Sequence, residues 1–290
     1  MELELCGVTK RYKNKLALNG ISLALTPGIY GLLGPNGAGK STLMNIVADV
    51  ILATEGTVCY NGKTIQALGA AYRKKLGYLP QATGYYKNFT ARRFLRYMAA
   101  LKGIGGKESG GEAERVLELV NLSEQAGKKI GSFSGGMIQR LGIANAILGS
   151  PEILILDEPT AGLDPKERIR FRNIISELSE NRIVILATHI VSDVEYIAKE
   201  IVMIQEGQII RQGSASSCTQ ELSGMVWELS CPSVMLHEYQ KNYKVINVAA
   251  AENELTLRLI AREQPGKEAR RASPKLEDVY LYFYGEDSAL

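Results

Sequence analysis

The stretch GPNGAGKS, from Gly34 to Ser41, decides the fold of this 290-residue chain. It fits the pattern GxxxxGK[ST], and it follows an apolar run, Ile29 to Leu33, that is typical of a buried strand. Residues 40–51, directly after it, place apolar side chains at helical spacing. A glycine-rich loop between a strand and a helix turns backbone N–H groups toward an anion. The sequence therefore predicts a phosphate-binding loop in an α/β core.

Within this loop, the side chains predict specific contacts to a nucleoside triphosphate. Lys40 is expected to reach the β- and γ-phosphates, Ser41 to ligate Mg²⁺, and Thr42 to lie near the α-phosphate. The alternative is a plain glycine turn, which would not require a lysine and a serine at these two positions. The residues expected to hold the phosphates are Gly34, Pro35, Asn36, Gly37, Ala38, Gly39, Lys40, Ser41 and Thr42.

A second motif, ILILDE from Ile153 to Glu158, is a buried apolar strand that ends in two acids. Carboxylates at such an edge are costly to desolvate beside a triphosphate unless a cation is bound. We expect Asp157 to hold Mg²⁺, directly or through water, and Glu158 to act as base toward the water that attacks the γ-phosphate. The alternative is two solvated carboxylates that cap the following helix.

The rest of the chain predicts an α/β fold, namely a phosphate-loop NTPase core with an antiparallel β subdomain and a helical insert, plus a small α+β C-terminal appendage. Asn61-Gly62 indicates a tight hairpin, and the glycine-rich stretch 102–112 indicates an exposed, mobile connection between two helices. The expected boundaries are 1–212 for the ATPase domain with its insert at about 82–150, 213–224 for a small-polar linker, and 225–290 for the appendage.

Composition narrows the classes of partner. A formal net charge of +3, without long Lys or Arg runs, indicates neither a nucleic-acid surface nor a polybasic membrane anchor. The four cysteines form no CxxC pair, so we expect reduced thiols. No run of about 18 apolar residues is present and the start lacks a secretion signal, which predicts a cytosolic chain.

The segment FSGGMIQR, from Phe133 to Arg140, resembles the LSGGQ signature of ABC-type ATPases, with Phe133 and Met137 as departures. In isolation it could be a serine cap on an ordinary helix. The resemblance implies ATP as ligand and a head-to-tail dimer, formed by two copies or by two paired ABC ATPases. In such a dimer Ser134, Gly135 and Gly136 of one subunit close over ATP held by the other. The departures leave the serine and glycines intact.

The same resemblance assigns roles to four further residues. Gln81 in YLPQ looks like the glutamine that contacts Mg²⁺ and water, and Asp164 in AGLD looks like the aspartate that couples the two sites. His189, which ends the strand IVILATH, resembles the switch histidine that binds the γ-phosphate and steadies Glu158. Tyr12 corresponds to the aromatic residue that stacks on adenine; the alternative is a half-buried strand residue.

Taken as an ABC transporter subunit, the chain would bind a separate transmembrane permease subunit at the cytoplasmic face, near Tyr85, Tyr86 and Phe89. The ending PKLEDVYLYFYG is similar to the tails of bacterial drug, antibiotic and polysaccharide exporter ATPases, which favours export. One alternative is a non-transport ABC ATPase that acts on DNA or the ribosome. Another is a regulatory binder without hydrolysis, against which Glu158 and His189 argue.

Overall fold

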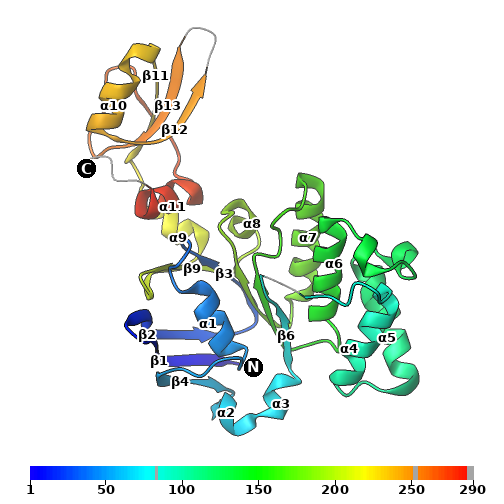
Figure 1. Ribbon diagram of the computed structural model, residues 1–290. Helices are drawn as coiled ribbons and strands as arrows, with labels where there is room; N and C mark the ends of the chain where they lie inside the picture. Colours follow the sequence, from blue (N-terminus) through cyan, green and yellow to red (C-terminus); the bar gives the residue numbers. More distant parts are fainter. Residues whose placement is uncertain (82–83, 251–253, 286–290) are drawn as a thin grey trace. The chain divides into compact units, whose positions relative to one another are not determined.

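The computed structural model describes residues 1–81, 84–250 and 254–285 (Figure 1). The chain forms two compact units, Met1–Ile210 and Arg211–Leu290, and each is described by itself. Within the described residues, none of the helices combines the length and the apolar character needed to span a bilayer.

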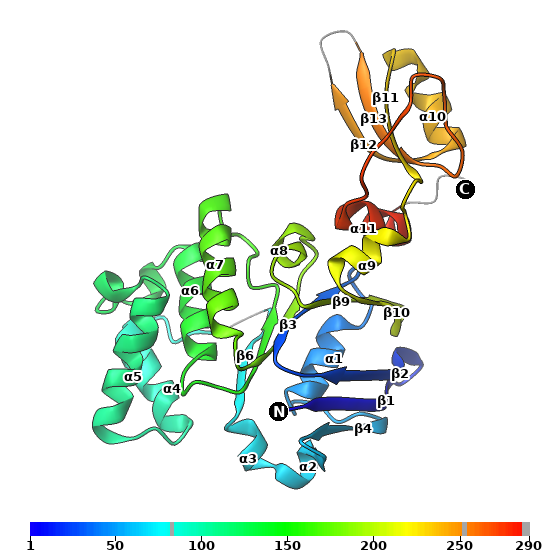
Figure 2. The same cartoon turned by 180° about the vertical axis from the view of Figure 1, so that it is seen from behind.

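The centre of the first unit is a six-stranded sheet with the order β10-β9-β3-β8-β7-β6. The five strands from β9 to β6 run parallel. Every residue of β7 and β8 is buried, because helices cover both faces of the sheet, and this explains their continuous apolar sequences. Figure 2 shows the same arrangement from behind. The strands are β3 (Gly28–Leu33), β6 (Leu76–Leu79), β7 (Ile153–Asp157), β8 (Ile183–Ala187), β9 (Glu200–Gln205) and β10 (Gln208–Gly213).

A second, antiparallel sheet has the order β2-β1-β4-β5 and confirms the predicted β subdomain. Its apolar face joins the main core, where Leu5 and Leu23 lie in one cluster with Met44. Asn61 and Gly62 form the predicted hairpin turn, and both have the positive φ that a tight turn requires. The strands are β1 (Leu3–Tyr12), β2 (Lys15–Leu25), β4 (Glu55–Tyr60) and β5 (Lys63–Thr64), followed by α2 (Ile65–Leu68) and α3 (Ala70–Arg73).

The helices around the six-stranded sheet determine where the phosphate loop and the acidic strand lie. Helix α1 (Lys40–Val47) packs on β7 and β8, so the phosphate loop and the acidic strand come together. Helix α7 (Pro165–Leu178) follows the acidic strand, and α8 (Ser192–Glu195) follows β8 and contacts β3.

The helical insert consists of α4 (Ala91–Leu101), α5 (Gly106–Leu119), two short 3-10 turns (Ser123–Gln125 and Ile130–Ser132) and α6 (Gly135–Ala146). Helix α4 packs against both α5 and α6, and α6 packs beside β6. Helix α6 therefore links the insert to the six-stranded sheet.

The prediction of a mobile connection at 102–112 is wrong for most of its length, because α5 already begins at Gly106. Ser109 is buried and its hydroxyl donates to the Gly106 carbonyl at 2.9 Å. Glu112 accepts a hydrogen bond from the Gly149 amide at 2.7 Å and forms an ion pair with Arg115. These contacts, two within the helix and one with distant Gly149, offset the low helix propensity of the glycines.

The second unit is an α+β domain whose sheet has the order β12-β13-β11-β14. Trp227, Leu229, Leu257 and Leu259 form its core, against which α10 packs. The sequence analysis did not identify β12. The last four residues of this strand are exposed, and its sequence shows no strict alternation of apolar and polar residues. The elements are β11 (Val226–Cys231), α10 (Leu236–Asn242), β12 (Lys244–Ala250), β13 (Leu255–Ile260), β14 (Arg270–Arg271) and α11 (Leu276–Tyr284).

The stretch 213–224, expected to be a linker, instead contains helix α9 (Ala215–Gln220), which belongs to the second unit. Ser214 caps this helix by accepting a hydrogen bond from the Ser217 amide at 3.1 Å. Cys218 is buried, and α9 packs on α11. The small polar residues are thus capping residues and a helix surface, which composition alone does not separate from a linker.

Candidate functional site

An open cavity of about 470 Å³ lies where β3 and β7 end and α1 begins. Ligands of parallel sheets bind at this carboxyl edge, because loops and helix starts converge there. The cavity is lined by Tyr12, Lys15, Ala17, Asn36, Gly37, Gly39, Lys40, Ser41, Thr42, Gln81, Asp157 and Glu158.

The phosphate loop has the backbone shape that its glycines predict. Gly39 precedes α1 with a φ of 112°, and a Cβ there would lie 2.6 Å from the Ala17 carbonyl oxygen. Gly34 is equally restricted, since its Cβ would lie 2.4 Å from the Ile204 carbonyl oxygen. Both positions therefore require glycine, and the loop closes tightly over the edge of the sheet.

Lys40 lies at the floor of the cavity and is only 7% exposed. Its ammonium donates to the carbonyls of Gly34, at 2.5 Å, and Pro35, at 3.1 Å. Burial lowers the pKa of Lys40, and the negative charges of Glu158 and Asp157 act in the opposite direction. A cation is thus held among carbonyl and carboxylate oxygens, in a position that suits an anionic ligand.

Asp157 ends β7 and is almost fully buried. Burial raises the pKa of Asp157, the neighbouring Glu158 raises it further, and a hydrogen bond from the Ser41 hydroxyl lowers it. A buried carboxylate beside a hydroxyl and a second carboxylate is an oxygen donor set of the kind that Mg²⁺ prefers. These residues therefore fit a magnesium ion, which would also relieve the repulsion between the two acids.

Glu158 has a left-handed backbone with a φ of 51°, which is unusual for a residue with a side chain. Its amide donates to the Ala187 carbonyl at 2.9 Å, which ties it to the end of β8. One carboxylate oxygen lies 2.8 Å from Nδ1 of His189, whose side chain is 58% exposed. The pair joins a buried acid to a histidine that faces outward.

The structure brings most of the predicted residues to one cavity, and it shows where the others lie. Gly34, Pro35 and Ala38 do not line the cavity, although the carbonyls of Gly34 and Pro35 bond to Lys40. His189 reaches the site through Glu158. Lys15 and Ala17 were missed, although Lys15 pairs directly with Tyr12 in the β1–β2 hairpin. That pairing is the signal that could have found Lys15, because a residue opposite a site residue lies close to the site.

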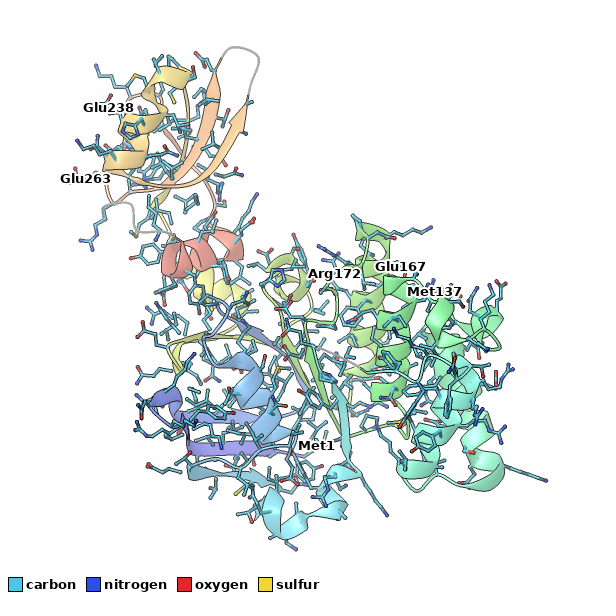
Figure 3. The ribbon with its side chains drawn as sticks, in the orientation of Figure 1. Met1, Met137, Glu167, Arg172, Glu238 and Glu263 are labelled. Carbon is cyan, nitrogen blue, oxygen red and sulfur yellow. The ribbon has the colours of Figure 1, made fainter. Side chains whose placement is uncertain are left out.

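The remaining predicted residues lie at helix starts away from the cavity wall. Ser134 caps α6 and accepts a hydrogen bond from the Met137 amide at 3.3 Å, with Gly135 and Gly136 forming the first turn. Asp164 caps α7 and accepts a hydrogen bond from the Glu167 amide at 2.9 Å. Figure 3 marks Met137 and Glu167 near the starts of these two helices.

The chain resembles known proteins both in sequence and in structure. Residues 18–161 match the family described as "ABC transporter". The chain is 35% identical to the linearmycin resistance ATP-binding protein of Bacillus subtilis (strain 168), over 75% of this chain and 70% of that protein. It is 30% identical to the Nod factor export ATP-binding protein I of Burkholderia orbicola (strain AU 1054), over 97% and 96%. A solved ATP-binding cassette, in a dimeric post-hydrolysis state bound to ADP and Pi, matches with a TM-score of 0.68 and 27% identity, over 73% and 98%.

Proposed function

The chain belongs to the ABC transporter family of ATP-binding proteins, and on this premise we propose that it is the ATP-hydrolysing subunit of a multi-component exporter that drives a separate membrane subunit. As a member of this family the chain is an ATPase that binds ATP. The observation that carries the proposal is the cavity that unites Lys40, Ser41, Asp157 and Glu158 at one edge of the sheet. Export is favoured by the printed functions of the linearmycin resistance and Nod factor export relatives.

We assign the binding of the triphosphate to the loop and to Lys40. The loop amides and the start of α1 provide positive potential, and Lys40 exchanges its two carbonyl partners for β- and γ-phosphate oxygens. Ser41, Asp157 and Gln81 would hold Mg²⁺, which supplies positive charge to the phosphate oxygens when bound. Tyr12, which lies at the rim and is half exposed, is assigned to stacking on adenine.

We assign the general base to Glu158. Its carboxylate lines the cavity beside Asp157 and Lys40, so it can accept a proton from a water placed between it and the γ-phosphate. His189 holds this carboxylate at 2.8 Å and is sufficiently exposed to reach a phosphate oxygen as well. The two side chains together orient the attacking water and stabilise the charge that develops on the phosphoryl group.

The site is proposed to be completed by a second subunit, arranged head to tail. Ser134, Gly135, Gly136 and Asp164 lie away from the cavity of their own chain, at the starts of α6 and α7. A 12-residue helix that is capped by a serine and begins with two glycines presents amides and a positive dipole end to an anion. The dimeric state of the related cassette is in accord with this arrangement. ATP held at the interface would then close the dimer, and hydrolysis would let it open.

Mixing two inactive variants tests this shared site. In a dimer of Lys40→Ala with Ser134→Arg, both defects fall on one site and the other site is intact. Equal mixing gives about half mixed dimers, each with one intact site of two, so up to about a quarter of the parent ATPase activity should return. The measurement is phosphate release as a function of the mixing ratio. The control is each variant alone at the same total concentration, and a mixture no more active than the average of the two controls would contradict head-to-tail pairing.

We propose that the membrane subunit binds an aromatic cluster on the insert, formed by Tyr86, Phe89 and Tyr97 with Arg93. Tyr86 stacks on Phe89 with ring centroids 5.0 Å apart, and Tyr97 meets both rings edge-on. The Arg93 guanidinium lies 4.1 Å from the Phe89 centroid. Tyr86 and Tyr97 are 53% and 41% exposed, and an exposed group of aromatic residues is typical of an interaction site. Such a contact would place the chain at the cytoplasmic face of the membrane.

Tyr85, which the sequence analysis also named for this contact, points elsewhere. Its ring packs edge-on against Phe94 with centroids 5.2 Å apart, and its hydroxyl lies against α6 near Gly142. Residues 82 and 83 lie outside the described residues.

Truncation of the cluster tests the docking surface. The double variant Tyr86→Ala, Tyr97→Ala should lose co-purification with the membrane subunit from detergent extracts, because aromatic anchors carry much of the affinity of an interface. Its basal ATPase rate without the membrane subunit should stay within about twofold of the parent, since these rings are remote from the cavity lining. The matched control is Leu101→Ala, which changes an exposed apolar residue at the end of α4, the helix that carries Tyr97. Full co-purification of the double variant would refute this surface.

A further inference from the structure

Gln139 lies one turn inside α6 and contacts the loop that carries the general base. Its amide nitrogen donates to the Pro159 carbonyl at 2.7 Å and more weakly to the Glu158 carbonyl at 3.4 Å. The side chain is partly buried and comes from the insert, whereas Glu158 and Pro159 follow a strand of the core sheet. One side chain therefore bridges the insert and the backbone of the catalytic loop.

The backbone that it holds is strained. A glutamate with a φ of 51° is in a left-handed conformation, which persists in proteins only where the surroundings enforce it. On the sheet side, the Glu158 amide bonds the end of β8, and the buried Thr160 hydroxyl donates to the buried carboxylate of Asp193 at 2.5 Å. On the insert side the carbonyls of Glu158 and Pro159 bond to Gln139. The orientation of the Glu158 carboxylate thus depends on contacts from both sides.

A second contact joins the same two segments. Leu163 is buried, and a Cβ at Gly136 would lie 3.6 Å from its side chain, so the first turn of α6 packs directly on the loop 158–164. Gly136 and Gln139 lie three residues apart and therefore on the same side of the helix. The first turn of α6 and the loop 158–164 are therefore packed against each other.

We propose that Gln139 is a positioning residue for Glu158 and that it couples the two ATP sites of the dimer. The inference rests on the proposed head-to-tail arrangement, in which Ser134 at the start of α6 contacts ATP held by the partner subunit. Because a helix moves as a rigid element, a shift of its first turn also moves Gln139, and with it the carbonyls of Glu158 and Pro159. Closure on the partner's ATP is then communicated to the base of the subunit's own site.

The test replaces Gln139 by methionine, which has a similar length and no donors. We expect kcat to fall about tenfold, which is the usual scale for losing one positioning hydrogen bond. The affinity for ATP, measured by equilibrium binding, should stay within about twofold, because Gln139 lies outside the cavity lining. The Hill coefficient for ATP should fall from above one toward one, since coupling between the sites is lost. Gln66→Met, an exposed glutamine on α2, is the matched control and should change none of these values.

Three outcomes would overturn the proposal: parent values for both kcat and the Hill coefficient, a lower kcat with an unchanged Hill coefficient, or a loss of ATP affinity. The last two would indicate a merely structural role. Should the methionine variant not fold, Gln139→Glu keeps the shape while it removes both donors, and the same readouts apply. A variant Glu158→Gln that hydrolyses at the parent rate would instead refute the proposed function, so the two failures are distinguishable.

Discussion

Replacing Glu158 by glutamine should lower ATP turnover by about 10²- to 10⁴-fold and leave ATP binding intact. The substitution removes the proton acceptor but keeps the shape of the side chain and an oxygen able to face His189, whose Nδ1 lies 2.8 Å from the carboxylate. The phosphate contacts come from the loop and Lys40, which are unchanged. ATP should therefore bind, close the dimer and remain unhydrolysed.

Single-turnover phosphate release and size-exclusion chromatography with ATP and Mg²⁺ check this result. The variant should elute as a dimer in ATP and as a monomer after the nucleotide is removed. Glu180→Gln, at an exposed glutamate remote from the cavity, is the matched control for the change of charge. Turnover at the parent rate would show that Glu158 is not the base and would leave its proposed role without support.

Replacing Lys40 by alanine should instead weaken binding itself, with a loss of ATP affinity of about 10- to 100-fold, the scale of hydrogen bonds to charged groups. The ammonium is the cation at the floor of the cavity, and both acids beside it repel a triphosphate once it is removed. Arginine should not substitute, because its larger planar group cannot fit a position that is only 7% exposed and bonded to two loop carbonyls.

Titration calorimetry with ATP measures this effect directly. Lys63→Ala, an exposed lysine in β5, is the control and should bind as the parent does. An unchanged dissociation constant for Lys40→Ala would contradict the assigned role. The two variants also separate the steps of the reaction, since the glutamate variant binds ATP with parent affinity but without turnover, whereas the lysine variant binds ATP weakly.

Much of the fold could be predicted because its signals are local. The strand, loop and helix around Gly34–Ser41 are each specified by consecutive residues, and the apolar runs of β7 and β8 indicate burial on both faces. The hairpin at Asn61-Gly62 is specified in the same way. The gathering of Lys40, Asp157 and Glu158 follows from parallel strands that end at one edge.

The two wrong expectations, a mobile connection at 102–112 and a linker at 213–224, share a different origin. The glycines of α5 and the small polar residues of α9 have low helix propensity or a linker-like composition, and contacts with distant residues decide their conformation. Tyr85 and Tyr86 are adjacent and chemically identical, yet one packs on Phe94 and the other is exposed. No local pattern separates the two residues, because Tyr85 also lies against Gly142 of α6, which is distant in the sequence.

The sequence by itself determined which chemical groups this protein brings to a triphosphate, since each motif is a short run whose residues act together. Only the tertiary structure decided how those groups are oriented. The left-handed backbone of Glu158, its contact with His189 and the hydrogen bonds from Gln139 join segments 19 to 31 residues apart. The contact with His189 forms only when β7 and β8 pair, and the hydrogen bonds from Gln139 form only when the insert packs against the core. Strain at a single residue persists only because that packing maintains it.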